Sequence, residues 1–192
     1  MELILIRHGL PEKIVNDDGS PADPPLSSTG LQQADKMADW LADLEIDCLY
    51  SSPMQRAMQT AAPLASLKGL EVRVRDGVAE YDQQSEHYIP VEQLKEQDYE
   101  RWLRLMKGEV DIDFPAFAKN VCDTLDEIVA ENRGRRVAVT CHGGVINVWT
   151  ARVIGFEAKM FFNPNYTSIN RFMAASSGEM SVISLNEHVH LR

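Results

Sequence analysis

Three places in the chain carry residues of the kinds that bind and transfer phosphoryl groups. Arg7 and His8 directly follow a short apolar run, and Arg56 follows a Ser-Ser-Pro sequence. His142 and Gly143 follow a second apolar run. Arginine presents a planar fork of donors that matches phosphate oxygens, and an activated histidine ring can act as a nucleophile. The start of a helix adds amides and a positive dipole to such a site. The sequence therefore indicates phosphoryl chemistry.

The elements that must position these residues alternate along the chain. We expect strands at Glu2–Ile6, Ile46–Tyr50, Glu71–Arg75, Arg136–Cys141, Ser168–Ala174 and Met180–Leu185. We expect helices at Gly30–Leu44, from Pro53 to about Leu67, at Pro115–Glu131 and from Gly143 onward. Such alternation predicts a three-layer α/β/α sandwich with a largely parallel central sheet. Ligands of open α/β sheets bind outside the carboxyl ends of the strands, so the candidate residues are expected to meet at one edge.

One segment departs from this alternation. Residues 81–113 are acidic and rich in Gln, Glu and aromatic side chains, with one helical stretch expected at Val91–Met106. We interpret residues 1–192 as a single domain in which about 81–113 form a helical insertion packed beside the sheet. The insertion can at the same time cap the site and shape substrate access.

Composition and charge exclude few classes of function. The chain has 192 residues, 44% of them hydrophobic and 25% charged, and a formal net charge of −10. An acidic chain is a poor candidate for nucleic-acid binding, which requires a basic face. It can still bind a small anion, because a few arginines in a cleft create a local positive field. We therefore expect a small phosphorylated substrate as the partner and no nucleic acid.

The sequence also favours a protein of the cytoplasm. No signal-peptide pattern is present at the start, and the apolar stretch 137–156 is too polar to span a bilayer, so no membrane partner is expected. The three cysteines are an odd number without metal-ligand spacing, which argues against disulfides. A homodimer is left open as the assembly.

Five segments resemble, in order and spacing, the motifs of the histidine phosphatase superfamily, which includes the cofactor-dependent phosphoglycerate mutases. These segments are Arg7 to Gly9, Leu26 to Gly30, Ser51 to Ala57, Glu80, and His142 to Gly144. A match of three residues would be weak, but five ordered segments that span nearly the whole chain are specific. The resemblance implies a metal-independent phosphatase that hydrolyses phosphomonoesters without a cofactor.

The same resemblance assigns roles to individual residues. His8 is expected to accept the phosphoryl group on one ring nitrogen, while the other donates to a backbone carbonyl. Glu80 is expected to protonate the leaving group and then to activate water. The residues expected to bind the phosphoryl oxygens are Arg7, Arg56, a protonated His142 and Gly143. The predicted catalytic set is thus His8, Glu80, Arg7, Arg56 and His142.

The sequence does not decide which carboxylate is the general acid. Asp76, Asp82 and Glu86 are carboxylates close to Glu80 in the sequence, and each could take its role. Cys141 beside His142 does not indicate a cysteine phosphatase, because the residues that follow supply no arginine to close a phosphate loop.

Two segments depart from the family pattern and leave the substrate open. The residues after Gly9 lack the hydroxyl and asparagine of mutase-like members, and those after Glu80 lack the usual glycine-and-aromatic pattern. The insertion offers four bases among many acids, Lys95, Arg101, Arg104 and Lys107, and a helix would scatter them over more than one face. Hydrolysis is therefore favoured over mutase-type transfer. A phosphatase that acts on a phosphorylated protein partner and an inactive scaffold are the remaining alternatives.

Overall fold

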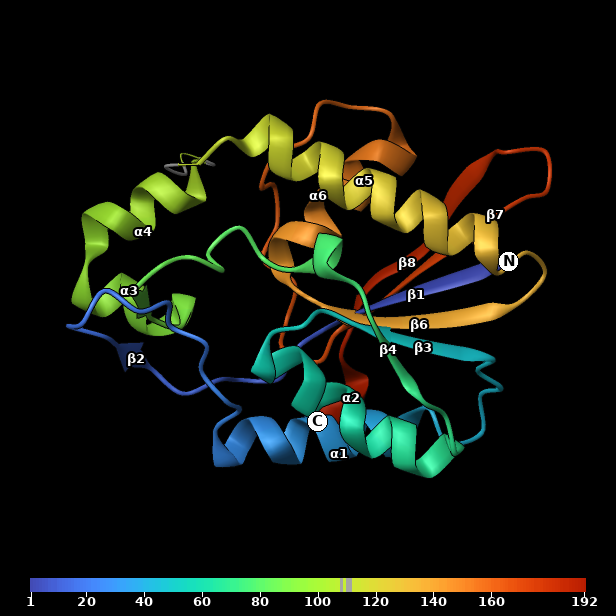
Figure 1. Ribbon diagram of the computed structural model, residues 1–192, viewed down its shortest axis with the longest axis horizontal. Helices are drawn as coiled ribbons and strands as arrows, with labels where there is room; N and C mark the ends of the chain where they lie inside the picture. Colours follow the sequence, from blue (N-terminus) through green and yellow to red (C-terminus); the bar gives the residue numbers. More distant parts are fainter. Residues whose placement is uncertain (108, 110–111) are drawn as a thin grey trace.

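A twisted sheet with helices on both faces forms the centre of the molecule (Figure 1). The computed structural model describes residues 1–107, 109 and 112–192. Within these residues the sheet contains β1 (Glu2–Arg7), β3 (Cys48–Ser51), β4 (Val72–Val74), β6 (Arg136–Cys141), β7 (Ile169–Ala174) and β8 (Met180–Glu187). The helices against it are α1 (Ser28–Trp40), α2 (Gln55–Lys68), α5 (Phe114–Glu131) and α6 (Gly143–Ile154).

The sheet has the order β4-β3-β6-β1-β7-β8, and its first four strands are parallel. β7 and β8 join antiparallel at the other edge. The largely parallel sheet and the layered α/β architecture predicted from the sequence are thus confirmed. β1 and β6 are neighbours in register, with Arg7 beside Cys141, so the residues that follow both strands leave the sheet together.

The core lies in two layers because successive side chains of β1 point to opposite faces of the sheet. Leu3 and Leu5 pack with α5 and α6, whereas Ile4 and Ile6 pack with α1 and α2. All four side chains are buried. A strand that is apolar on both faces is what a central parallel strand covered by helices requires.

Several predicted boundaries were wrong by a few residues. α1 ends at Trp40 and not at Leu44, because the amides of Ala42 and Leu44 bond to the carbonyls three residues back, those of Asp39 and Leu41, and not to those four residues back. α2 begins at Gln55, so Pro53 precedes the helix and does not lie in its first turn.

The insertion differs from its prediction in the same way. The single helix expected over residues 91–106 is two helices, α3 (Val91–Gln97) and α4 (Tyr99–Met106). They are separated at Asp98, whose backbone has left the helical region with φ −150° and ψ 82°. Parts of the predicted segment 81–113 (residues 108, 110 and 111) lie outside the described residues.

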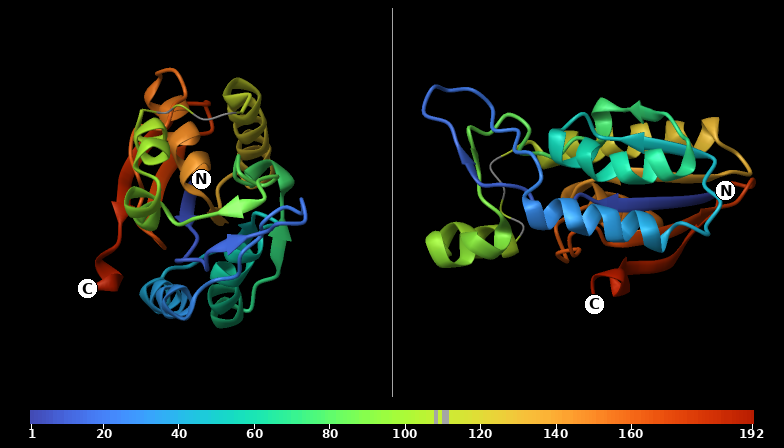
Figure 2. Two further views of the ribbon diagram at one scale, coloured as in Figure 1. Left: turned by 90° about the vertical axis from the view of Figure 1, so that its left-hand side faces the viewer. Right: turned by 90° about the horizontal axis from the view of Figure 1, so that it is seen from below.

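A small second sheet connects the insertion to the loop after β1. β2 (Ile14–Val15) pairs antiparallel with β5 (His87–Tyr88), and neither strand was predicted. Figure 2 shows α3 and α4 at one end of the molecule, beyond the carboxyl ends of the parallel strands. The division into one domain with an insertion stays a prediction.

Candidate active site

The loop after β1 is held against the start of α1 by a close approach of two backbones. A Cβ atom on Gly9 would lie 2.6 Å from the carbonyl oxygen of Gly30, and one on Gly30 would overlap the backbone of Leu10. Ser27 caps α1 by accepting from the amide of Gly30, and its hydroxyl donates to the carbonyl of Leu10 at 2.9 Å. Only glycine permits this contact, which fixes the backbone next to His8.

His8 is buried, and its two ring nitrogens have different surroundings. Nδ1 lies 2.7 Å from the carbonyl oxygen of Gly9, which can only accept, so Nδ1 carries a proton. Burial, followed by the charges of Arg56 and Arg7, lowers the pKa of His8 well below its ordinary value. The ring is therefore neutral at pH 7, and Nε2 keeps an unprotonated lone pair.

Two buried arginines flank His8, and each has donors without a protein partner. Arg7 donates from Nη1 to Asn163 at 3.1 Å and to the carbonyl of Pro164. Arg56 donates from Nη2 to Asp82 at 2.9 Å. Arg7 Nε and Arg56 Nε and Nη1 are buried and unpartnered. Such donors lose their water without replacement, so they favour an anion that can accept from them.

His142 lies directly behind His8, with 5.1 Å between the ring centroids. Its Nε2 is 2.8 Å from the hydroxyl of Ser52, and its Nδ1 is buried without a partner. Burial, and then the charge of Arg56, lowers the pKa of His142 well below its ordinary value. His142 is therefore neutral in the free site, because a low-polarity environment and two arginines disfavour another cation. A protonated His142 in contact with a bound phosphoryl group stays a prediction.

Glu80 accepts hydrogen bonds from two backbone amides. Oε2 accepts from Gly144 at 2.8 Å and Oε1 from Tyr81 at 3.1 Å. A Cβ atom on residue 144 would overlap the carboxylate, so this approach requires glycine. Burial and the neighbouring charge of Asp82 raise the pKa of Glu80 to about 7, against the effect of the two amides and Arg56. A carboxyl group with this pKa can give and take a proton near neutral pH.

The nearby carboxylates that could have replaced Glu80 occupy different places. Asp82 lines the same cavity, but its Oδ1 is the partner of Arg56. Asp76 and Glu86 are exposed and do not line the cavity. Glu80 is thus the carboxylate that combines a place in the cavity with a raised pKa.

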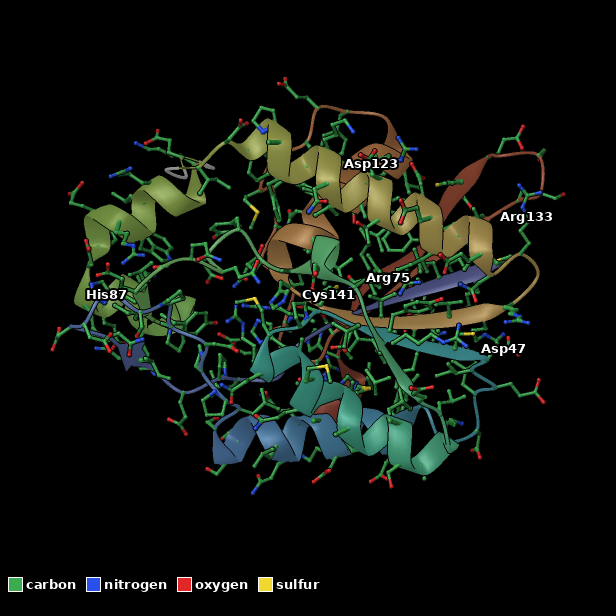
Figure 3. All side chains as sticks on the ribbon, in the orientation of Figure 1. Asp47, Arg75, His87, Asp123, Arg133 and Cys141 are labelled. Carbon is green, nitrogen blue, oxygen red and sulfur yellow. The ribbon has the colours of Figure 1, made fainter. Side chains whose placement is uncertain are left out.

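The predicted residues surround one cavity of about 760 Å³. Arg7, His8, Arg56, Glu80 and Gly143 line it, and His142 stands behind His8. Figure 3 shows Cys141, at the end of β6, in the middle of the molecule, and His87 at the end where the insertion lies. The geometry therefore brings all six predicted site residues together.

The insertion forms a wall of this cavity. Leu94 of α3 and Arg101 and Arg104 of α4 line it, together with the acids Asp98, Glu100 and Glu109. The bases are less scattered than expected, since both arginines face the cavity, whereas Lys95 lies over the ring of Trp102. His87, which no sequence argument included, also lines the cavity.

Sequence reasoning missed the residues that hold the site together. Ser52 orients His142, and Asp82 pairs with Arg56. Tyr88 and Tyr166 lie under the guanidinium groups of Arg56 and Arg7, at 4.6 and 4.1 Å from the ring centroids. Ser52 could have been found from its place in the motif before Arg56, but nothing in the sequence marks the tyrosines.

The described part of the chain offers no group of three His, Cys, Asp or Glu side chains that could hold a metal ion. Nor does any helix in that part of the chain have the length and apolar character needed to cross a membrane.

The model of the histidine phosphatase superfamily (branch 1) matches residues 3–187. The chain belongs to this superfamily. The family predicted from the five motifs is thus confirmed, and the protein is a phosphatase that acts through a phosphohistidine intermediate.

Individual relatives carry names from the same class. Phosphoserine phosphatase 1 of Hydrogenobacter thermophilus is 28% identical over 85% of this chain and 81% of its own length. Adenosylcobalamin/alpha-ribazole phosphatase of Escherichia coli is 27% identical over 85% of this chain and 84% of its own length. A mutant phosphoserine phosphatase of Entamoeba histolytica, solved in complex with phosphoserine, is 25% identical with a TM-score of 0.78, covering 100% of this chain and 99% of that one.

The pKa of Glu80 gives a test of this geometry. Replacing Asp82→Asn removes a negative charge that raises the pKa of Glu80, and leaves Arg56 free to lower it further. The alkaline limb of the kcat/KM profile, where Glu80 loses its proton, should therefore move to lower pH by on the order of one unit. The same substrate is used throughout, so its own ionisation cancels. Glu86→Gln, an exposed acid outside the cavity, is the control and should leave the limb in place. An unchanged limb in Asp82→Asn would show that Glu80 does not set it.

Proposed function

We propose that this phosphatase hydrolyses small phosphomonoesters with His8 as its nucleophile and without a metal ion or cofactor. The observation that carries the proposal is a neutral histidine with one free ring nitrogen, placed among buried donors that have no protein partner. These donors are Arg7 Nε, Arg56 Nε and Nη1, and His142 Nδ1. A phosphoryl group has several acceptor oxygens and a negative charge, so it can accept hydrogen bonds from these donors.

Binding of the phosphoryl group follows from this arrangement. The two arginines supply fixed positive charge, and Gly143 lies in the first turn of α6, where amides and the helix dipole favour anions. In the proposed tautomer the hydroxyl of Ser52 accepts from the amide of Met54 and donates its proton to Nε2 of His142. His142 then carries its own proton on Nδ1 and can donate it to a phosphoryl oxygen as a neutral ring. A bound dianion also raises the pKa of His142 and so favours a second proton.

In the first step the lone pair of His8 Nε2 attacks phosphorus, and the bond from phosphorus to the leaving oxygen breaks. The leaving oxygen takes a proton from Glu80, whose pKa of about 7 keeps a substantial fraction of the carboxyl groups protonated at neutral pH. The negative charge that spreads over the phosphoryl oxygens is stabilised by the donors of Arg7, Arg56 and His142. Donors of this kind typically contribute a factor of ~10²–10³ each.

In the second step water replaces the alcohol. Glu80, now ionised, accepts a proton from water as the oxygen attacks phosphorus and the bond to His8 Nε2 breaks. Inorganic phosphate leaves, and His8 and Glu80 return to their starting states. One carboxyl group can serve as acid and then as base because its pKa of about 7 lies close to the working pH.

A cavity of about 760 Å³ lies in the range of small-molecule sites and favours such a substrate over a phosphorylated protein surface. Phosphoserine is one candidate, since the relatives from Hydrogenobacter and Entamoeba carry that name. Retention of a second phosphoryl group for mutase action would need further cations, but the arginines of the wall stand beside three acids. A cytoplasmic location fits three cysteines without disulfides. The homodimer stays a prediction.

Phosphate release and isomerisation can be measured in one assay. Purified protein treated with EDTA is supplied with a panel of phosphomonoesters and with 3-phosphoglycerate primed by bisphosphoglycerate. We expect phosphate release that EDTA leaves unchanged, because arginines supply the charge neutralisation, and negligible isomerisation. Activity lost in EDTA and restored by a divalent ion would contradict metal independence. Isomerisation faster than phosphate release would make the enzyme a mutase.

The role of Glu80 predicts a dependence on the leaving group. Glu80→Gln should lower kcat for alkyl phosphates by ~10²–10⁴-fold, because a poor leaving group requires a proton in the transition state. For aryl phosphates with acidic leaving groups, Glu80→Gln should lower kcat far less. Asp82→Asn is the matched variant, since Asp82 is the one of the three alternative acids that lines the cavity. If Asp82→Asn shows this dependence and Glu80→Gln does not, the acid has been assigned to the wrong residue.

A further inference from the structure

The end of the chain packs against the first helix and reaches the segment behind His8. η2 (Val189–Leu191) contacts α1, and the ring of His190 lies 6.5 Å from that of Trp40. Figures 1 and 2 show the C-terminus beside α1, at a distance from the helices of the insertion. His190 is outside the cavity and has no part in the reaction described above.

His190 contacts a buried threonine. Its Nε2 lies 3.0 Å from Thr167 Oγ1, and Thr167 donates the single proton of that hydroxyl to the carbonyl of Tyr166 at 2.8 Å. Thr167 Oγ1 is therefore the acceptor, and His190 Nε2 carries the donated proton. Burial lowers the pKa of His190, so the ring is neutral at pH 7 and has only this one proton to give.

Thr167 has an unusual backbone. Its φ is +54°, a left-handed conformation that β-branched residues rarely adopt because it is strained. The residue is fully buried. Surrounding contacts must hold such a conformation in place. Among the described residues, the hydrogen bond from His190 is the one that reaches the side chain of Thr167 from outside the segment.

The strained segment also contacts Arg7, the last residue of β1, and His8, which follows it. The amide of Thr167 donates to the carbonyl of His8 at 3.3 Å, and the amide of Arg7 donates to the carbonyl of Ser168 at 3.1 Å. The ring of Tyr166 lies 5.8 Å from the ring of His8 and 4.1 Å from the guanidinium carbon of Arg7. A shift of residues 166–168 would thus displace the nucleophile and one phosphate-binding arginine together.

We propose that His190 is a positioning residue for the nucleophile. Its Nε2–H donor holds Thr167 in the left-handed conformation, and Thr167 and Tyr166 in turn fix the backbone of His8 and the side chain of Arg7. The proposal rests on the proposed role of His8. A misplacement of the order of 1 Å can lower a rate by ~10²-fold, so loss of the donor should act on the chemical step.

Two substitutions of His190 separate the donor from the packing. His190→Phe keeps a ring against Trp40 but has no donor, whereas the amide of His190→Gln can donate from nearly the same place. Thr167→Val removes the acceptor and keeps the shape of the side chain. Val189→Ala, an exposed neighbour in η2, is the control for general loosening of the chain end.

The rate of phosphohistidine formation is measured by rapid quench, KM is measured in steady state, and the unfolding midpoint is measured in urea. We expect His190→Phe and Thr167→Val to slow phosphorylation of His8 by ~10-fold or more with KM changed little. His190→Gln should recover most of the rate, and Val189→Ala should match wild type. The double variant His190→Phe/Thr167→Val should be no slower than Thr167→Val, because that variant already lacks the acceptor of the His190 hydrogen bond.

Three results would overturn the proposal. The first is a wild-type rate in His190→Phe. The second is an equal loss in His190→Phe and His190→Gln that follows their unfolding midpoints, which would reduce His190 to a packing residue. The third is that wild-type protein is active but carries no label on His8. This result would contradict the proposed function itself, and the missing label distinguishes it from a failure of the His190 proposal alone.

Discussion

Burial of positive charge without enough protein partners is the constraint on which the site depends. Arg7 and Arg56 are nearly inaccessible to water, yet three of their donor nitrogens have no protein acceptor. Each unsatisfied buried donor costs about 1–3 kcal/mol, so the fold maintains this arrangement against its own stability. Burial, together with the same charges, keeps His8 and His142 neutral, and burial raises the pKa of Glu80 to about 7. One arrangement thus prepares the nucleophile, the acid and the phosphate contacts together.

The rest of the structure brings these residues to one point from distant parts of the chain. β1 and β6 are paired in register, so the loops that carry His8 and His142 leave the sheet side by side. The approach of Gly9 to Gly30 fixes the first loop, and Gly144 admits the carboxylate of Glu80 to the start of α6. Asp82 is the acid bonded to Arg56, and it leaves two of that arginine's nitrogens unpartnered. Partial neutralisation of this kind holds the guanidinium in place and keeps its charge available to a ligand.

The sequence predicted the layers of the fold, the family and the residues that surround the cavity. Alternating apolar runs and short motifs are local signals that can be read from the sequence. Because ligands bind at the carboxyl ends of parallel strands, these signals also predicted that the motifs lie together in one site. The structure added what local patterns do not contain. The pairing of β2 with β5 and the place of Tyr166 depend on contacts between distant segments. The neutral state of His142 in the free site is likewise outside the reach of local patterns, because it depends on burial and on two arginines from other elements. The break at Asp98, in contrast, has local contacts that the prediction overlooked, since the Asp98 side chain accepts from the amide of Arg101 at the start of α4.

If His8 Nε2 carries the phosphoryl group, the phosphorylated intermediate can be trapped. Wild-type protein mixed with radiolabelled substrate is quenched within one turnover, digested and mapped. We expect label on the peptide that contains His8, stable in base and lost in acid, and no label in His8→Asn. Label that is stable in acid and maps to a serine, or label on a cysteine such as Cys141, would contradict it.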